Sequence, residues 1–263
     1  MKAVILGCGP AGLAAAAAAV SSGYEVVFIS KTSGRSQQYG CQYLHAPIPG
    51  YEDVPSVRVR YTLEGTPEEY RHKVYGDKWE GKVSPEDFIG EHDAWDIRET
   101  YARMWADLIG SLRIPIIIND ISPSRIAELR NRIRHLRPDR IISTVPAPVI
   151  CVNNHAFTGH QIWANGSVSP FAGTLDLAAN MVVCDGTRAT PWYRVSNVFG
   201  YRTTEWAKRP GGEAVPVLKP LASDCDCWPE VLRVGRYGSW SKSALVHEVY
   251  PAVKQALEEG WRM

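Results

Sequence analysis

The chain has 263 residues, of which 45% are hydrophobic and 22% charged, and its formal net charge is +1. This length can bury a real core, as one elaborated domain or two small ones. The balanced charge excludes a bulk electrostatic attraction to nucleic acid or membrane, and no apolar run is long enough to span a bilayer. The six cysteines are scattered, which favours the reducing cytoplasm over a disulfide framework.

The first thirty residues predict a β-α-β unit. An apolar run at 3–6 suits a buried parallel strand and leads into the turn Gly7-Cys8-Gly9-Pro10-Ala11-Gly12. The alanine-rich run 13–20 favours a helix, Gly23 is placed to end it in a left-handed conformation, and 25–29 is a second strand.

The glycine spacing inside this unit indicates a dinucleotide site. Gly7 permits a tight turn, Gly9 lets the backbone approach a pyrophosphate, and Gly12 lets the helix pack closely on the strand. The unpaired N–H groups and partial positive charge at the start of the helix favour phosphate binding.

The end of the second strand leaves the choice of dinucleotide open. Sites for NAD and FAD usually place an acidic residue there to accept hydrogen bonds from the adenosine ribose. This chain has Ser30, followed by Lys31 and Arg35. These hydroxyl and cationic groups suit the 2′-phosphate of NADP; alternatively, Ser30 contacts the ribose while Lys31 lies in solvent.

The stretch after the second strand is less regular. Residues 37–50 are polar and contain prolines, so we expect a loop beside the cofactor crevice. Alternating side chains predict a half-exposed strand at 57–63, and Ser-Pro-Glu-Asp predicts a helix start at 84–87. An apolar stripe predicts a helix at 96–109 that faces the core.

Strand, helix and strand then return, at 114–118, 125–137 and 140–146. Arginines flank the apolar face of this helix, at Arg125, Arg130, Arg132, Arg134 and Arg137. A solvated basic surface is the simpler interpretation, and nucleic-acid binding through the Arg125–Arg137 helix is the alternative.

These patterns divide the chain into three parts. Residues 1–150 form a dinucleotide-binding region with a helical insertion at about 60–110. Residues 151–230 are β-rich, with strands expected at 178–184, 192–201 and 215–218. Residues 231–263 return to the first region, with a strand at 231–234 and a helix at 243–259 that Pro251 breaks or kinks.

The cysteines raise the question of a metal. Cys225-x-Cys227 is a tight pair, and the upstream candidates are Cys151, His155, His160 and Cys184. A structural zinc site takes four Cys or His ligands, commonly in closely spaced pairs. Because only one close pair is evident and its spacing is unusual, buried or free thiols are the simpler interpretation.

Three pieces of the chain, taken together, carry a family resemblance. They are Gly7-x-Gly9-x-x-Gly12, Ile141-Ile142-Ser143-Thr144-Val145-Pro146, and Val234-Gly235-Arg236-Tyr237-Gly238-Ser239-Trp240 before the last helix. In this order they resemble FAD-dependent oxidoreductases of the amine oxidase and UDP-galactopyranose mutase superfamily. The resemblance implies a Rossmann-like α/β FAD-binding fold with a parallel sheet, plus a small β-rich substrate region.

The resemblance also implies where FAD lies. It adds to the N-terminal motif the cofactor contacts Gly40, Gln42, Thr144, Val145, Gly235, Arg236, Tyr237 and Trp240. The candidates for substrate orientation or proton transfer are Tyr43, His45, Arg194 and Lys219. Lys219 would correspond to the lysine that can hold a water beside the flavin N5 in amine oxidase-like proteins. Because the FAD motif at the C-terminal end is not needed by an NADP-only protein, FAD is favoured over NADP.

The predicted activity is an FAD-dependent oxidation at a C–N or C–H bond of an amine-like or modified-base substrate, or a flavin-assisted elimination or rearrangement. A small substrate region leaves the flavin open to a large substrate, such as a hypermodified base in phage-type DNA, or is completed by homo-oligomerisation. Three rivals remain: a mutase-like flavoenzyme without net redox change, an NADP-dependent reductase, and a non-catalytic nucleotide-binding protein. No membrane partner is expected.

Overall fold

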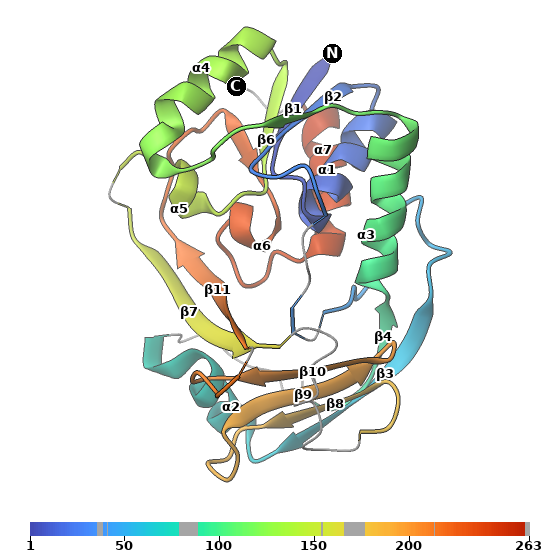
Figure 1. Cartoon of the computed structure of the whole chain (residues 1–263), viewed down its shortest axis with the longest axis vertical. Coiled ribbons are helices and arrows are strands. Elements are labelled where there is room, and N and C mark those ends of the chain that lie inside the picture. The colour runs from blue at the N-terminus through green and yellow to red at the C-terminus, as the bar shows by residue number, and fades with distance from the viewer. Residues whose placement is uncertain are drawn as a thin grey trace.

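The computed structural model describes residues 1–35, 39–40, 42–78, 89–153, 155–165, 177–212 and 214–260. Two sheets form separate layers, with the parallel sheet and most helices in one layer and a larger mixed sheet in the other (Figure 1). The helix start predicted at 84–87 lies outside the described residues. No helix in the described ranges combines the length and apolar composition needed to cross a bilayer.

The first sheet has five parallel strands in the order β12-β6-β1-β2-β5. Their bounds are β1 (Lys2–Leu6), β2 (Glu25–Ser30), β5 (Ile116–Ile118), β6 (Arg140–Ser143) and β12 (Val231–Arg233). Because β1 lies in the centre between β2 and β6, the carboxyl ends of these three strands share one edge, where α/β proteins bind dinucleotides. The Rossmann-like fold predicted from the sequence is confirmed.

Helices cover both faces of the parallel sheet. One face packs against α1 (Pro10–Ser21), α3 (Ile97–Trp105) and α7 (Val249–Glu258), and the other against α4 (Ile126–Leu136). Successive side chains of a strand point to opposite faces, so Ala3 and Ile5 join the first core and Val4 and Leu6 join the second. A sheet covered on both faces requires apolar residues on both faces, which explains the unbroken apolar run of β1.

The second sheet has seven strands in the order β11-β7-β10-β9-β8-β3-β4. Their bounds are β3 (Ser56–Glu64), β4 (Gly90–Trp95), β7 (Phe157–Ala164), β8 (Met181–Asp185), β9 (Trp192–Val198), β10 (Tyr201–Trp206) and β11 (Val215–Ser223). All neighbours are antiparallel except β3 and β8. Helix α2 (Pro67–Tyr75) packs its buried side chains into the core of this sheet.

Shorter elements complete the fold. They are α5 (Ala147–Ile150), α6 (Gly235–Gly238), the 3-10 turns Gly76–Lys78, Pro123–Arg125 and Val246–Glu248, and the π-helical segment Ala106–Ser111 that extends α3. The chain leaves the parallel sheet after α5 to enter β7, and it returns from β11 to β12 (Figure 1). Two earlier passages, from β2 to β3 and from β4 to α3, also join the layers.

Two local predictions differ from the structure. The single strand predicted at 192–201 is the hairpin β9–β10, whose two-residue turn is Phe199-Gly200, with φ of +53° and +76°. Positive φ at both positions matches the turn geometry that twisted hairpins favour. Pro251 does not break the last helix, because it occupies the first turn of α7, where its missing N–H has no intrahelical partner to lose.

Candidate functional site

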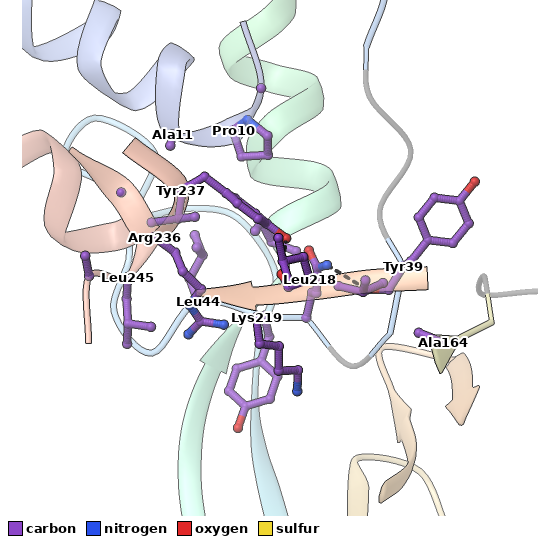
Figure 2. Close-up of a pocket in the computed structure, with 18 of the residues that line it drawn as sticks. Pro10, Ala11, Tyr39, Leu44, Ala164, Leu218, Lys219, Arg236, Tyr237 and Leu245 are labelled. Atoms are coloured by element: carbon purple, nitrogen blue, oxygen red, sulfur yellow. Dashed lines mark hydrogen bonds between the residues drawn. The ribbon is translucent and has the colours of Figure 1, made fainter. Parts of the chain in front are cut away.

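A cavity of about 630 Å³ lies between the two sheets. Figure 2 shows Pro10 and Ala11 at the start of α1 on one side, Arg236 and Tyr237 beside them, and Lys219 on β11 opposite. The predicted site residues that line this cavity are Gly7, Gly9, Pro10, Ala11, Gln42, Tyr43, His45, Thr144, Arg194, Lys219, Gly235, Arg236 and Tyr237. The volume lies within the range of ligand pockets.

The turn between β1 and α1 is too tight for side chains at two of its glycines. Gly7 has φ of +92°, and a β-carbon there would lie 2.8 Å from Thr144 Oγ1. A β-carbon on Gly12 would lie 2.0 Å from the carbonyl oxygen of Gly7. Thr144 is held in place by donating from both N and Oγ1 to the Leu6 carbonyl oxygen, at 3.0 and 2.9 Å. The first turn of α1 therefore sits directly on the ends of β1 and β6.

The N-terminus of α1 faces this cavity without a side-chain cap. Its N-cap residue is Gly9, in an extended conformation, and Pro10 occupies the first turn. The first N–H groups of the helix are thus available to an anionic ligand, and the helix dipole favours one.

The C-terminal motif lies against this same helix start. A β-carbon on Gly235, which has φ of +71°, would lie 3.0 Å from the β-carbon of Ala11. A β-carbon on Gly238 would lie 2.4 Å from the Ser143 carbonyl oxygen at the end of β6. The glycines bring α6 against both elements, and Arg236 lines the cavity beside them. Two segments far apart in sequence therefore form one backbone cradle.

Cys8 and the predicted residues at the end of β2, Ser30, Lys31 and Arg35, lie outside the cavity lining. The Cys8 thiol is buried and donates to Ser30 Oγ at 3.1 Å, behind the glycine turn. Lys31 and Arg35 are exposed. The structure thus packs the Ser30 hydroxyl against the turn and leaves both cations in solvent.

Three other predicted residues shape the cavity from outside its lining. A β-carbon on Gly40 would lie 2.6 Å from Glu205 Oε1, and one on Gly7 would lie 3.1 Å from Val145 Cγ1. Trp240 is 3% exposed and donates from Nε1 to the Thr158 carbonyl oxygen at 2.9 Å, so it fastens the segment after α6 to β7.

A cluster of buried charges forms the opposite wall of the cavity. Glu205, on β10, is 3% exposed and accepts from Arg194 at 2.5 Å, from Lys219 Nζ at 3.2 Å and from the Tyr193 hydroxyl. Burial alone would raise the pKa of the Glu205 carboxyl, but the charges of Arg194 and Lys219 hold this pKa far below its usual range. Glu205 is therefore ionised at neutral pH.

Lys219 is the group in this wall that titrates near neutrality. Burial lowers the pKa of its ammonium to about 8, because the positive charges of Arg194 and Arg236 add to desolvation and outweigh the raising effect of Glu205. At pH 7 to 8 both forms of the amine are populated, so Lys219 can hold or give up a proton at Nζ inside the cavity.

The loop after β2 supplies an aromatic and imidazole edge. Tyr43 and Tyr61 share a hydroxyl hydrogen bond of 2.5 Å, and the ring of His45 lies 4.9 Å from that of Tyr43. Burial lowers the pKa of His45, and the nearby His247, with ring centroids 5.9 Å apart, lowers it further. His45 is therefore neutral at pH 7 and able to accept a proton.

The sequence did not point to Glu205, Tyr61 or Tyr75, which also line the cavity. Glu205 lies in the run Tyr201–Trp206, where a single acidic residue among threonines and aromatics is the only local signal. Its partners Arg194 and Lys219 stand on other strands, so the cluster exists only after the sheet has formed.

The arginines in and beside α4 are not all available to a ligand. Arg125 pairs with Glu128 at 3.1 Å, and the guanidinium of Arg130 lies 4.5 Å from the centre of the Trp228 ring. Because α4 covers the face of the parallel sheet opposite α1, a polymer bound there would lie away from the first turn of α1.

No protein-family model and no curated protein matches the sequence, but solved structures match the fold. A reduced UDP-galactopyranose mutase superposes with a TM-score of 0.56 at 12% identity, covering 98% of this chain and 95% of its own. The p-nitrophenol 4-monooxygenase of Pseudomonas putida gives 0.56 at 13% identity, covering 98% and 80%. The 2,6-dihydroxypyridine-3-hydroxylase of Arthrobacter nicotinovorans gives 0.56 at 10% identity, covering 98% and 83%. This chain shares the fold of these three enzymes.

Proposed function

We propose that the protein is an FAD-dependent oxidoreductase whose reaction takes place in the cavity between the two sheets. One observation carries this proposal: a backbone cradle suited to a dinucleotide faces a buried cluster of ionisable groups across a single cavity. The likeness of fold to a mutase, a monooxygenase and a hydroxylase supports it.

The residues present fit the cofactor. The uncapped start of α1 would hold the pyrophosphate. Because Gly235 has no side chain, the segment that carries Arg236 can lie against this helix start. Arg236 offers a charge-assisted contact to a phosphate or to the electron-rich edge of the flavin. When bound, FAD supplies the capacity to accept two electrons, which none of the side chains lining the cavity has.

The residues of the opposite wall would orient the substrate and accept a proton from it. In its neutral form, Lys219 would take a proton at Nζ from the substrate amine, hydroxyl or carbon while electrons leave the substrate. Glu205 would stay ionised and hold Lys219 and Arg194 in position through its two carboxylate oxygens. Neutral His45 would be a second acceptor on the loop side. These groups suit oxidation at a C–N or C–H bond of an amine-like or modified-base substrate.

The purified protein is expected to be yellow, with the two visible absorption bands of oxidised flavin, and to release FAD on heating. Anaerobic addition of amine substrates should then bleach the bound flavin. A colourless protein that takes up no FAD but is stabilised by NADPH would contradict the proposal and favour an NADP-dependent reductase.

The fold shared with UDP-galactopyranose mutase favours one alternative, a flavoenzyme without net redox change. The same assay separates the two functions. Turnover that requires pre-reduced FAD and leaves the oxidation state of the substrate unchanged would support the mutase-like reaction, whereas substrate-dependent bleaching would exclude it for that substrate.

A pH titration of the bound flavin tests the place of Lys219 without a known substrate. We expect the visible bands to shift through a transition near pH 8, as the ammonium next to the cavity loses its charge. Lys219→Met should abolish the transition, whereas Lys254→Met, at a half-exposed position on α7, should retain it. An unchanged transition in Lys219→Met would show that another group titrates beside the flavin.

A further inference from the structure

Four metal-ligating side chains converge where the chain passes between the two layers. Cys151 and His155 lie between α5 and β7, and Cys225 and Cys227 lie between β11 and β12. One ligand atom from each, a sulfur or a ring nitrogen, lies within 4.8 Å of all the others. Two close pairs are therefore present, although only the second is evident from the cysteine spacing alone.

The separations among three of these atoms, those of Cys151, His155 and Cys227, match a tetrahedral zinc site. With Zn–S bonds of about 2.3 Å and a Zn–N bond of about 2.0–2.1 Å, two sulfurs are about 3.8 Å apart, and a sulfur and a nitrogen about 3.6 Å. Cys151 Sγ and Cys227 Sγ are 3.8 Å apart. His155 Nδ1 lies 3.5 Å from Cys151 Sγ and 3.4 Å from Cys227 Sγ.

The surroundings of His155 and of the Cys225–Cys227 loop support ligation. His155 directs Nδ1 at the sulfurs, while its Nε2 lies 3.4 Å from Asp226 Oδ1. A carboxylate behind the second ring nitrogen orients metal-binding histidines and selects their tautomer. Arg233 donates from Nη1 to the Cys225 carbonyl oxygen at 3.0 Å and from Nη2 to that of Cys227, so the loop backbone is held as well.

We propose that Cys151, His155, Cys225 and Cys227 bind one Zn²⁺ as a structural site. The four protein ligands fill the tetrahedron and leave no position for substrate, and thiolate and imidazole ligands favour zinc over magnesium or calcium. On binding, the three thiols give up their protons to solvent and His155 is neutral.

The position of this site gives it a role in the fold. It joins the connection from α5 to β7 to the connection from β11 to β12. Arg233, which holds the cysteine loop, is the last residue of β12 and lies two positions before Gly235. A bound zinc would therefore tie these two connections together and hold the chain in place shortly before Gly235.

Metal analysis of the full chain, purified under reducing conditions from zinc-supplemented cells, tests the site. We expect one zinc ion per chain, and Co²⁺ exchange should give the intense visible bands of tetrahedral thiolate coordination. Cys227→Ser should lose the metal and Cys184→Ala, whose cysteine lies in β8 in the core of the other sheet, should keep it. A zinc-free wild-type protein, or one with a Cys151–Cys227 disulfide, would overturn the proposal.

Because a cysteine variant could fail to fold, a surface variant gives a second readout. Asp226 is 89% exposed in its side chain, so Asp226→Ala should fold normally but bind zinc about 10–100-fold more weakly in competition with a chelator. Asp224→Ala, at an exposed position two residues earlier, should leave the affinity unchanged. Equal affinities in both variants would overturn the ligand assignment of His155.

Discussion

Replacing Glu205 with glutamine is expected to lower the free energy of unfolding by about 3 kcal/mol, measured as a shift in the urea midpoint followed by tryptophan fluorescence. Glutamine keeps the shape of the side chain but removes the charge that Arg194 and Lys219 share. Both cationic groups are largely buried, so the loss of their common counter-charge leaves them poorly compensated.

The pH dependence of this stability difference distinguishes the loss of a charge from a packing defect, because a packing defect would not depend on pH. Although burial opposes it, the pKa of Glu205 is lower in the folded chain, because Arg194 and Lys219 stabilise its charge. Such a carboxyl stabilises the protein above its unfolded-state pKa of about 4.3, and the contribution is lost as the pH falls below that value. The part of the difference between wild type and Glu205→Gln that comes from the carboxylate charge should therefore be present at neutral pH and shrink below about pH 4.

The same variant should change the titration of Lys219. Glu205 raises the pKa of Lys219, so its removal should move the flavin transition from near pH 8 to lower pH. Glu64→Gln, at an exposed position at the end of β3, is the control and should change stability by less than about 0.5 kcal/mol. If Glu205→Gln were as stable as wild type and its flavin transition were unshifted, the carboxylate of Glu205 would not interact with the charges of Arg194 and Lys219 as we propose.

The parts of the molecule that were predicted correctly are those with local causes. The β1–α1–β2 unit follows from an apolar run, a glycine turn and an alanine-rich helix that adjoin in sequence. The clash that a side chain on Gly12 would create arises from a residue only five positions away. Thr144 and Gly235 are distant, but a resemblance in sequence order was sufficient to suggest them.

The charged wall of the cavity has no such local cause. Arg194 and Glu205 meet because the turn Phe199-Gly200 pairs β9 with β10, and an apolar, bulky residue in a left-handed conformation gives little warning of a turn. Lys219 joins them through strand β7, which stands between β10 and β11 and was not predicted. Strand order across a mixed sheet depends on distant pairings that residue spacing does not encode.

The proposed zinc ligands illustrate the same limit. Cys225 and Cys227 are two positions apart in sequence, but Cys151 and His155 join them only because the chain passes twice between the layers at one place. The sequence offered His160 and Cys184 equally well. His160 lies on β7 opposite Lys219 and Cys184 lies in β8, so neither belongs to this group of four.

Replacing Gly12 with alanine is expected to abolish FAD retention and to lower the free energy of unfolding of the cofactor-free protein by about 3 kcal/mol. The added β-carbon would lie 2.0 Å from the carbonyl oxygen of Gly7, so the first turn of α1 must move away from the ends of β1 and β6. This movement displaces the N–H groups proposed to bind the pyrophosphate. Flavin absorbance after gel filtration measures retention, and urea unfolding of the cofactor-free protein measures stability.

Gly34→Ala is the matched control, because a β-carbon there meets no atom within 4 Å. It should retain FAD and change stability by less than about 0.5 kcal/mol. The two readouts separate the effect on folding from the effect on FAD binding. A destabilised Gly12→Ala protein that still bound FAD with wild-type affinity would show that the turn is needed for the fold but not for cofactor binding. The phosphates would then have to contact Arg236 without the helix start, and Arg236→Ala rather than Gly12→Ala would release the cofactor.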